Sequence, residues 1–195
     1  MTARLPLAGI VLAAGAGERM GGPKALLEIE GEPLARLHLK RLSAAGCDPV
    51  VIVTRSELVD RFNAGAVVVA SRAPDPAGSL AVGLRALGGD EVDLFVITPV
   101  DAWPAHVETI ARLVGTVRAG AEAATPSYQA RGGHPVVIRA RALEGFVATP
   151  RPLRDVLASL GDARVRVEVA DASVATDLDT PADVFAATGA LPRFV

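Results

Sequence analysis

Residues 9–27, GIVLAAGAGERMGGPKALL, join an apolar run to a glycine-rich segment that carries two cations. The apolar run covers 8–14, and the segment after it contains Gly15, Gly17, Arg19 and Lys24. Glycine lets the backbone approach an anion closely and direct N–H groups at it, while arginine and lysine supply positive charge. A short buried strand that leads into such a turn predicts a site for phosphate groups. A nucleotide or another polyphosphate is therefore the first ligand to expect.

Two better-known phosphate-binding motifs do not fit this segment. A dinucleotide-binding fingerprint requires G-x-G-x-x-G. Gly15 and Gly17 match its first two glycines, but Met20 stands at the third. A P-loop requires G-x-x-x-x-G-K-[ST], whereas here Pro23 interrupts the motif before its lysine and Ala25 replaces the hydroxyl residue. The segment therefore predicts a different phosphate-binding arrangement.

The same segment also imitates a secretory leader. Arg4, the apolar run after it and Ala14-Gly15-Ala16 match the three regions of such a signal in order. The apolar run is short, and the glycine-rich segment that follows is too organised for a discarded leader. We therefore expect a cytoplasmic protein.

The composition bounds the class of protein. With 195 residues, of which 50% are hydrophobic, the chain suits one domain with a large core, which we expect to span residues 1–195. The 20 Lys and Arg residues nearly balance the 22 Asp and Glu residues without a basic stripe, so nucleic acid is not an expected partner. The single cysteine, Cys47, excludes a disulfide framework and is expected to pack in the core. No apolar stretch approaches the ~20 residues of a membrane span.

Apolar runs alternate with helix-like stretches along the chain. Strands are expected at 7–13, 50–54, 67–70, 94–98, 121–126, 134–138 and 165–169. Helices are expected at 33–45, 56–63, 79–86, 105–119, 141–148, 153–160 and 181–188. The strands are short, rich in Val and Ile and apolar at nearly every position, which is typical of strands covered on both faces. This alternation predicts a three-layer α/β/α fold with a mainly parallel sheet, whose ligands bind beyond the carboxyl ends of the strands.

Two acidic segments are candidates for holding a metal ion. Asp101 follows the strand expected at 94–98, and a carboxylate beside a phosphate-binding loop suits Mg²⁺ on a nucleotide. Capping of the next helix is the alternative role for this side chain. In DLDTPAD (177–183), Asp179 and Asp183 flank a helix start, where both carboxylates can also serve as local caps. The two segments serve one ion only if the fold brings them together, which the sequence leaves open.

Three further residues have a structural interpretation beside a functional one. Ser79 either caps a helix or begins one whose N–H groups face the ligand. His134, in a Gly-Gly-His-Pro turn, is either structural or part of the site. Trp103 is expected to be a packing residue rather than a stacking platform. No nucleophile-elbow pattern surrounds the Ser, His and Asp residues, so covalent hydrolysis is not supported.

Five segments of the chain occur in an order and at a spacing that are typical of one enzyme family. They are LAAGAGERMGGPKALL (12–27), TPVD (98–101), RGGHPVVI (131–138), LRDVL (153–157) and DLDTPAD (177–183). Together they resemble the MobA-like nucleotidyltransferases, most closely the molybdenum cofactor cytidylyltransferase branch. The resemblance implies a Rossmann-like nucleotide-diphospho-sugar transferase fold. It also implies transfer of a nucleoside monophosphate from a nucleoside triphosphate to a phosphorylated small-molecule acceptor, with release of pyrophosphate.

The resemblance implies roles for individual residues. The residues implied in nucleotide binding are Leu12, Ala13, Ala14, Gly15, Gly17 and Ser79. Arg19 and Lys24 would bind the triphosphate and act in catalysis with Asp101. Mg²⁺, the implied cofactor, would be held by Asp101 and Asp179, and His134 would lie beside the acceptor. CTP and a phosphorylated pterin such as Mo-molybdopterin are the expected substrates. The resemblance also implies a protein partner in molybdoenzyme maturation.

Two segments depart from the family pattern, and both touch the substrate-facing rim. DPAGS (75–79) alters part of the turn that contacts the base, and DAWP (101–104) is one residue longer than the usual D-x-P. The preference for CTP rests on Ala14, because guanylyl-transferring relatives resemble L-A-G-G at this position. The methyl group of alanine fills space that a glycine would leave open for a purine.

Two alternatives remain. A sugar-1-phosphate nucleotidyltransferase uses the same scaffold, although this chain lacks the extra segments that such enzymes commonly use to hold a sugar. A non-catalytic carrier of a nucleotide or pterin is the alternative from another class. It would not need the implied metal pair of Asp101 and Asp179, which argues against it. Pyrophosphate release distinguishes the carrier from the enzymes.

Overall fold

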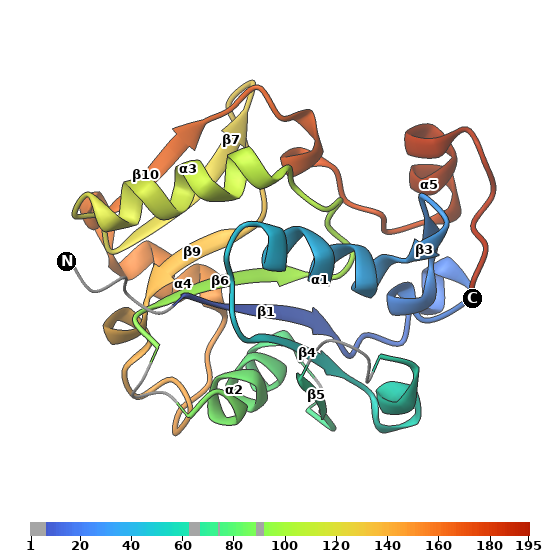
Figure 1. Ribbon diagram of the computed structural model, residues 1–195, viewed down its shortest axis with the longest axis horizontal. Helices are drawn as coiled ribbons and strands as arrows, with labels where there is room; N and C mark the ends of the chain where they lie inside the picture. The colour runs from blue at the N-terminus through green and yellow to red at the C-terminus, as the bar shows by residue number, and fades with distance from the viewer. Residues whose placement is uncertain (1–6, 63–66, 74, 89–91) are drawn as a thin grey trace.

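The computed structural model describes residues 7–62, 67–73, 75–88 and 92–195. Strands and helices alternate along the chain, as Figure 1 shows. The strands of the main sheet are β1 (Leu7–Ala13), β4 (Val50–Thr54), β5 (Val67–Ala70), β6 (Leu94–Pro99), β7 (Ala123–Tyr128), β8 (Arg131–Gly132), β9 (Val136–Arg139) and β10 (Arg164–Glu168). The α-helices are α1 (Leu34–Ala44), α2 (Pro76–Ala86), α3 (Val107–Arg118), α4 (Leu153–Ser159) and α5 (Pro181–Thr188). A separate hairpin pairs β2 (Glu28–Ile29) with β3 (Glu32–Pro33).

The main sheet has eight strands in the order β10-β7-β9-β6-β1-β4-β5, with β8 paired to β7. β1 lies between β4 and β6 and is parallel to both. β9 is antiparallel to β6 and to β7. Because this strand reverses direction against both neighbours, β7 and its parallel partner β10 run the same way as β1. The carboxyl ends of the parallel strands therefore meet at one edge, and the expected mainly parallel sheet is confirmed.

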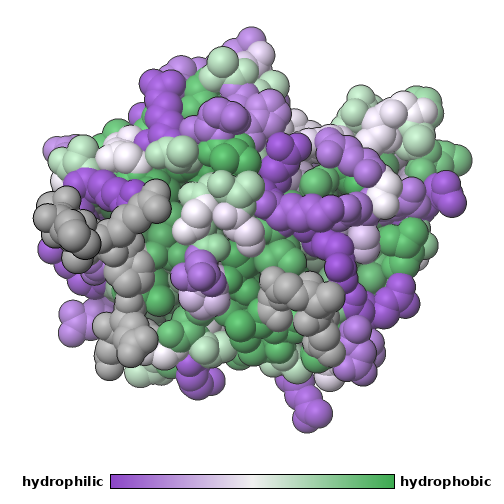
Figure 2. Space-filling model, in the orientation of Figure 1, coloured by the Kyte–Doolittle hydropathy of each residue, from purple (hydrophilic) through white to green (hydrophobic). Residues whose placement is uncertain are grey.

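Helices cover both faces of the sheet, with α1 and α3 on one face and α2 and α4 on the other (Figure 1). Alternate residues of β1 belong to two separate cores. Val11 shares a core with Leu34 of α1 and Ile110 of α3, whereas Ile10 shares a core with Leu80 of α2. A strand buried on both faces has no polar side to show, which is why these runs are apolar throughout. In the same orientation, hydrophilic residues line most of the outline of the molecule and hydrophobic ones show through its middle (Figure 2).

The structure corrects the boundaries of several expected elements. The helix expected at 141–148 is a short 3-10 turn, Ala140–Leu143, followed by Gly145 with a φ of 75°, a left-handed conformation that ends helical geometry. The helix expected at 56–63 is also 3-10, over Ser56–Arg61, and residue 63 lies outside the described residues. Arg4, which opens the leader-like pattern, lies outside them as well. The hairpin and β8 were not expected at all.

Helix α2 begins at Pro76, three residues before the expected start at Ser79. The Asp75 carboxylate accepts a hydrogen bond from the Gly78 N–H at 2.8 Å, and Pro76 occupies the first helical position. An Asp cap followed by proline is a strong helix start, so the altered turn of the family pattern serves as a cap. Of the described helices, none is both long enough and apolar enough to cross a bilayer.

Candidate active site

A pocket of about 520 Å³ opens at the carboxyl ends of β1 and β6. The sequence-predicted residues that line it are Leu12, Ala14, Gly15, Gly17, Arg19, Lys24, Ser79, Asp101 and Asp179. Asp75 and Pro76, from the turn expected to contact the base, also line it, as do Pro99 and Val100, which sequence reasoning did not assign to it. These come from α2 and from the end of β6, so the pocket spans β1 from one side to the other.

The glycine-rich loop is shaped by Gly17. Its φ is 68°, and a Cβ atom at this position would lie 1.9 Å from the carbonyl oxygen of Gly22. Only glycine permits both the left-handed backbone and the close approach. Met20 is almost completely buried and anchors the loop to the core. As a result the loop folds back on itself, which places Arg19 and Lys24 over the end of β1.

Lys24 joins the two acidic segments that the sequence left apart. Its Nζ donates to Asp101 Oδ2 at 3.0 Å and to Asp179 Oδ1 at 2.7 Å, and its side chain is only 12% exposed. Arg19 Nη2 lies 3.3 Å from the same oxygen of Asp179. Burial acts to lower the pKa of Lys24, but the hydrogen bonds with Asp179 and Asp101 outweigh it and raise that pKa. The lysine is therefore a charged group held between two carboxylates.

The acidic residues of the two segments differ in whether they cap a helix. Asp101 does not cap α3, because the N–H of His106 at that helix start bonds Asp171 instead, at 2.9 Å. Asp183, in contrast, forms a capping box with Thr180, so the local interpretation holds for this residue. Asp179 lies just before the box with its carboxylate on Lys24. The carboxylates of Asp101 and Asp179 thus contact Lys24 and cap no helix, whereas that of Asp183 is engaged in a cap.

The donor set fits Mg²⁺ only in combination with a phosphate ligand. Asp101 and Asp179 already share one cation, the Lys24 ammonium, through oxygens within 3.0 Å of it. Within the described residues, no group of three or more His, Cys, Asp or Glu side chains is arranged to hold a metal ion. Mg²⁺ is commonly bound through one or two carboxylates together with substrate phosphates and water. These two residues therefore fit a metal ion that is held jointly with a nucleotide.

His38 of α1 supports the Asp101 segment and was missed by sequence reasoning. Its Nε2 donates to the carbonyl oxygens of Ala102 at 2.9 Å and Val100 at 3.3 Å, on either side of Asp101. Burial lowers the pKa of His38 from its ordinary 6.5 to about 4. The imidazole is therefore neutral at pH 7, with the proton on Nε2. The only sequence signal was a histidine on the apolar face of a predicted helix, which is too weak to assign.

We expect His38 to make the stability of the protein depend on pH. Between about pH 6.5 and about pH 4 the unfolded chain binds a proton at this residue that the folded protein does not. Its contribution is fully present above pH 6.5 and is lost as the pH falls through that window. Thermal unfolding of wild type and His38→Gln at pH 7.5 and pH 5 should show a smaller acid-induced drop in Tm for the variant. His106→Gln, at an exposed histidine, is the control, and parallel drops in wild type and His38→Gln would contradict the assignment.

Three other residues that the sequence assigned to the site form hydrogen bonds outside the Lys24–Asp101–Asp179 network. Ser79 lines the pocket, but it is buried and its Oγ lies 3.1 Å from Ser71 Oγ. Ala13 is buried below the pocket, and its carbonyl accepts from Thr54 Oγ1 at 3.3 Å. His134 does not line this pocket. Its backbone N–H donates to the Val174 carbonyl at 3.0 Å, and among the described residues its ring Nδ1 has no hydrogen-bond partner.

A glycine-rich loop with two cations, a carboxylate pair and a mainly parallel sheet that brings them together fit a nucleotidyltransferase with a Rossmann-like fold. Comparison with protein families agrees: the model of the MobA-like NTP transferase domain matches residues 9–165. The chain belongs to this family.

Individual relatives carry different names. The chain is 53% identical to the probable molybdenum cofactor guanylyltransferase of Opitutus terrae over 51 residues, which are 26% of this chain and 25% of that protein. It thus spans only a quarter of that relative's length. It is 32% identical to nicotine blue oxidoreductase of Paenarthrobacter nicotinovorans over 205 aligned residues, covering 88% of this chain and 91% of that protein. The crystal structure of Rv0371c from Mycobacterium tuberculosis has the same fold, with a TM-score of 0.79, 22% identity and coverage of 95% of this chain and 99% of that one.

Proposed function

We propose that this protein is an Mg²⁺-dependent cytidylyltransferase that joins the CMP of CTP to a phosphorylated pterin such as Mo-molybdopterin and releases pyrophosphate. The observation that carries the proposal is the Lys24–Asp101–Asp179 network at the mouth of a glycine-rich phosphate loop. We propose that it acts in the cytoplasm and that its product is used in the maturation of molybdoenzymes.

The proposed chemistry needs little covalent help from the protein. An oxygen of the acceptor phosphate attacks the α-phosphorus, and the bond from that phosphorus to the bridging oxygen breaks, so pyrophosphate leaves with the electron pair. The acceptor is already an anion, and therefore no general base is required. Arg19 and Lys24 would neutralise charge on the triphosphate and orient it for in-line attack. Mg²⁺ bound by Asp101 and Asp179 would supply further neutralisation at the phosphates.

The decisive experiment is pyrophosphate release. The four nucleoside triphosphates are assayed against a panel of acceptors that includes a pterin phosphate and sugar-1-phosphates. Release that requires a pterin phosphate supports the proposal, and release with sugar-1-phosphates alone favours the sugar nucleotidyltransferase. Nucleotide binding without release under any condition indicates a carrier.

One observation favours a second candidate function, that of an oxidoreductase. The alignment with nicotine blue oxidoreductase, at 32% identity, covers 88% of this chain. An oxidoreduction would transfer electrons between its substrate and a carrier and release no pyrophosphate. Following the absorbance of an added electron carrier, with a nicotinamide dinucleotide as the first one tried, in parallel with pyrophosphate therefore distinguishes the two functions in one assay.

We expect CTP to bind more tightly than GTP. Ala14 lines the pocket, and in the proposed binding mode its methyl group would take up space that a larger base needs. Calorimetric titration with each Mg²⁺–nucleotide measures the preference, and Ala14→Gly should shift it toward GTP. Ala16→Gly adds the same backbone freedom and removes another methyl group from the pocket lining, so it shows whether the shift is specific to position 14. GTP or UTP binding to wild type as tightly as CTP would overturn the base assignment and leave only the nucleotidyltransferase class.

A further inference from the structure

A second pocket, of about 450 Å³, lies beside the first. The two share the segment 177–183: Asp177 lines the second pocket and Asp179 the first. Asp177 is also paired with Ala102 in an isolated β-bridge, next to Asp101 in the chain. A molecule in the second pocket would therefore be separated from the Lys24–Asp101–Asp179 network only by the segment 177–183.

Trp103 gives this pocket an aromatic surface. It is the single tryptophan of the chain and belongs to the DAWP segment (101–104), which is one residue longer than the family pattern. The backbone N–H of Trp103 donates to the Thr176 carbonyl at 2.8 Å, which holds the segment against the chain that precedes α5. The side chain is partly buried against the core and also lines the pocket. An indole that is packed on one side against the core and faces the pocket with the rest of its surface is suited to stacking on a planar ring.

The polar groups of the pocket carry both signs of charge. Arg131 is exposed, and one guanidinium nitrogen donates to the Ala175 carbonyl at 3.3 Å. Among the described residues, no carboxylate lies within 4.0 Å of its guanidinium nitrogens, so most of its donors are free for a ligand. Asp177 is the acidic counterpart on the lining. A ring with both carbonyl acceptors and N–H donors at its edge matches such a pair.

Charge also decides where an acceptor phosphate would point. Asp177 and Asp183 outnumber Arg131 on the lining of the second pocket, so the net charge there would repel a phosphate. Arg19 and Lys24 of the first pocket would attract it. A ligand with a ring at one end and a phosphate at the other would therefore span the 177–183 segment, with its phosphate toward Lys24.

We propose that the second pocket is the acceptor site, and that it selects a phosphorylated planar nitrogen heterocycle whose ring stacks on Trp103 and whose edge bonds Arg131 and Asp177. This inference rests on the proposed function and names the structural basis of its acceptor specificity. It assigns Trp103 a ligand contact in addition to its packing role.

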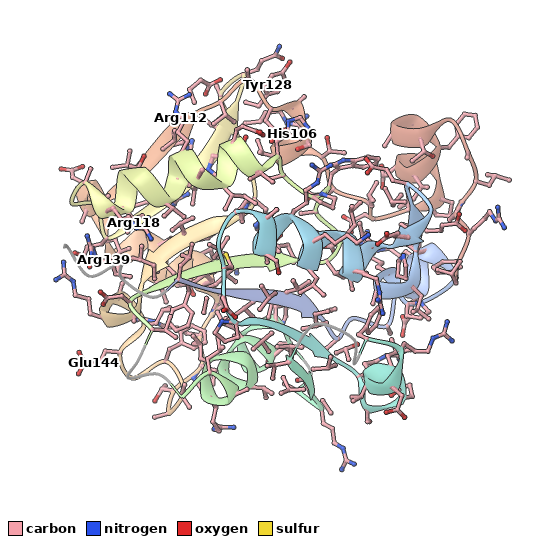
Figure 3. The ribbon with its side chains drawn as sticks, in the orientation of Figure 1. His106, Arg112, Arg118, Tyr128, Arg139 and Glu144 are labelled. Atoms are coloured by element: carbon pink, nitrogen blue, oxygen red, sulfur yellow. The ribbon has the colours of Figure 1, made fainter. Side chains whose placement is uncertain are left out.

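The test is calorimetric titration with a pterin monophosphate, and separately with CTP, of wild type and four variants. Trp103→Ala should weaken pterin phosphate binding by about tenfold or more, as loss of a stacking ring does elsewhere, and Trp103→Phe should retain most of it. Arg131→Ala should also weaken it. Arg112→Ala is the matched control, because Arg112 projects from α3 into solvent (Figure 3). CTP affinity should be the same in all five proteins, and Tm values exclude unfolding of Trp103→Ala.

Each outcome bears on the inference. Pterin phosphate that binds equally to wild type, Trp103→Ala and Arg131→Ala would overturn the acceptor pocket while leaving the proposed function intact. Failure of pterin phosphate to bind wild type at millimolar concentration would also overturn it. If binding depends on Trp103 but no pyrophosphate is released with any nucleotide, the pocket stands and the proposed function fails.

Discussion

Asp101→Asn is expected to abolish turnover and leave the fold intact. The side chain is 35% exposed, contacts Lys24 and caps no helix, so an amide of the same shape costs little stability. It removes the negative charge that, in the proposed function, holds a cation on the nucleotide. An effect of several kcal/mol on the transition state corresponds to a loss of about a thousandfold in kcat. Pyrophosphate release and thermal unfolding, measured on the same preparations, test both halves of the prediction.

The matched control for this variant is Asp162→Asn. Asp162 is exposed and lies before β10, at the amino edge of the sheet and therefore opposite the site. Asp179→Asn asks whether the second carboxylate shares the ion. Near-normal turnover of Asp101→Asn at ordinary Mg²⁺ concentration would mean that Asp101 serves only as the charge partner of Lys24.

Lys24→Met should lose about 10²- to 10³-fold in kcat, the loss seen when a preorganised electrostatic donor is removed. Arg19→Ala should lose turnover in the same direction. Both side chains belong to a loop rather than to the hydrophobic core, so we expect the cost in turnover to exceed the cost in Tm. Lys40→Met, at an exposed lysine of α1 that pairs with Glu32, is the control. A loss in turnover below tenfold with an unchanged Tm would reject the phosphate-contact role.

Metal binding gives the Lys24 variant a second readout that does not depend on activity. Because the ammonium occupies the space between Asp101 and Asp179, it competes with any cation for those oxygens. Lys24→Met should therefore bind Mn²⁺ more tightly than wild type when no nucleotide is present, as measured by electron paramagnetic resonance of free Mn²⁺. Equal affinity in the two proteins would indicate that these carboxylates do not form a metal site.

Local patterns in the sequence determined most of the scaffold. The apolar runs at β1 and β4 match the strands residue for residue, because a strand buried on both faces must be apolar throughout. The run at β5 matches as well, although this edge strand is partly exposed. The start of α5 was equally predictable, since Thr180 and Pro181 form a helix start whose signal is entirely local. Where propensity was ambiguous, as at 141–148, the prediction of a helix was wrong. There a left-handed glycine decides the conformation.

The candidate site was predictable as a set of residue types but not as an arrangement. The sequence alone determined that a glycine-rich loop with two cations follows β1 and that carboxylates stand at Asp101 and Asp179. Only the tertiary structure decided that these carboxylates, 78 residues apart in the chain, meet at Lys24, that His38 holds the backbone around Asp101, and that Trp103 lines a second pocket. The physical reason is that caps, turns and apolar periodicity act over a few residues, whereas the meeting of distant side chains depends on how every strand and helix packs between them.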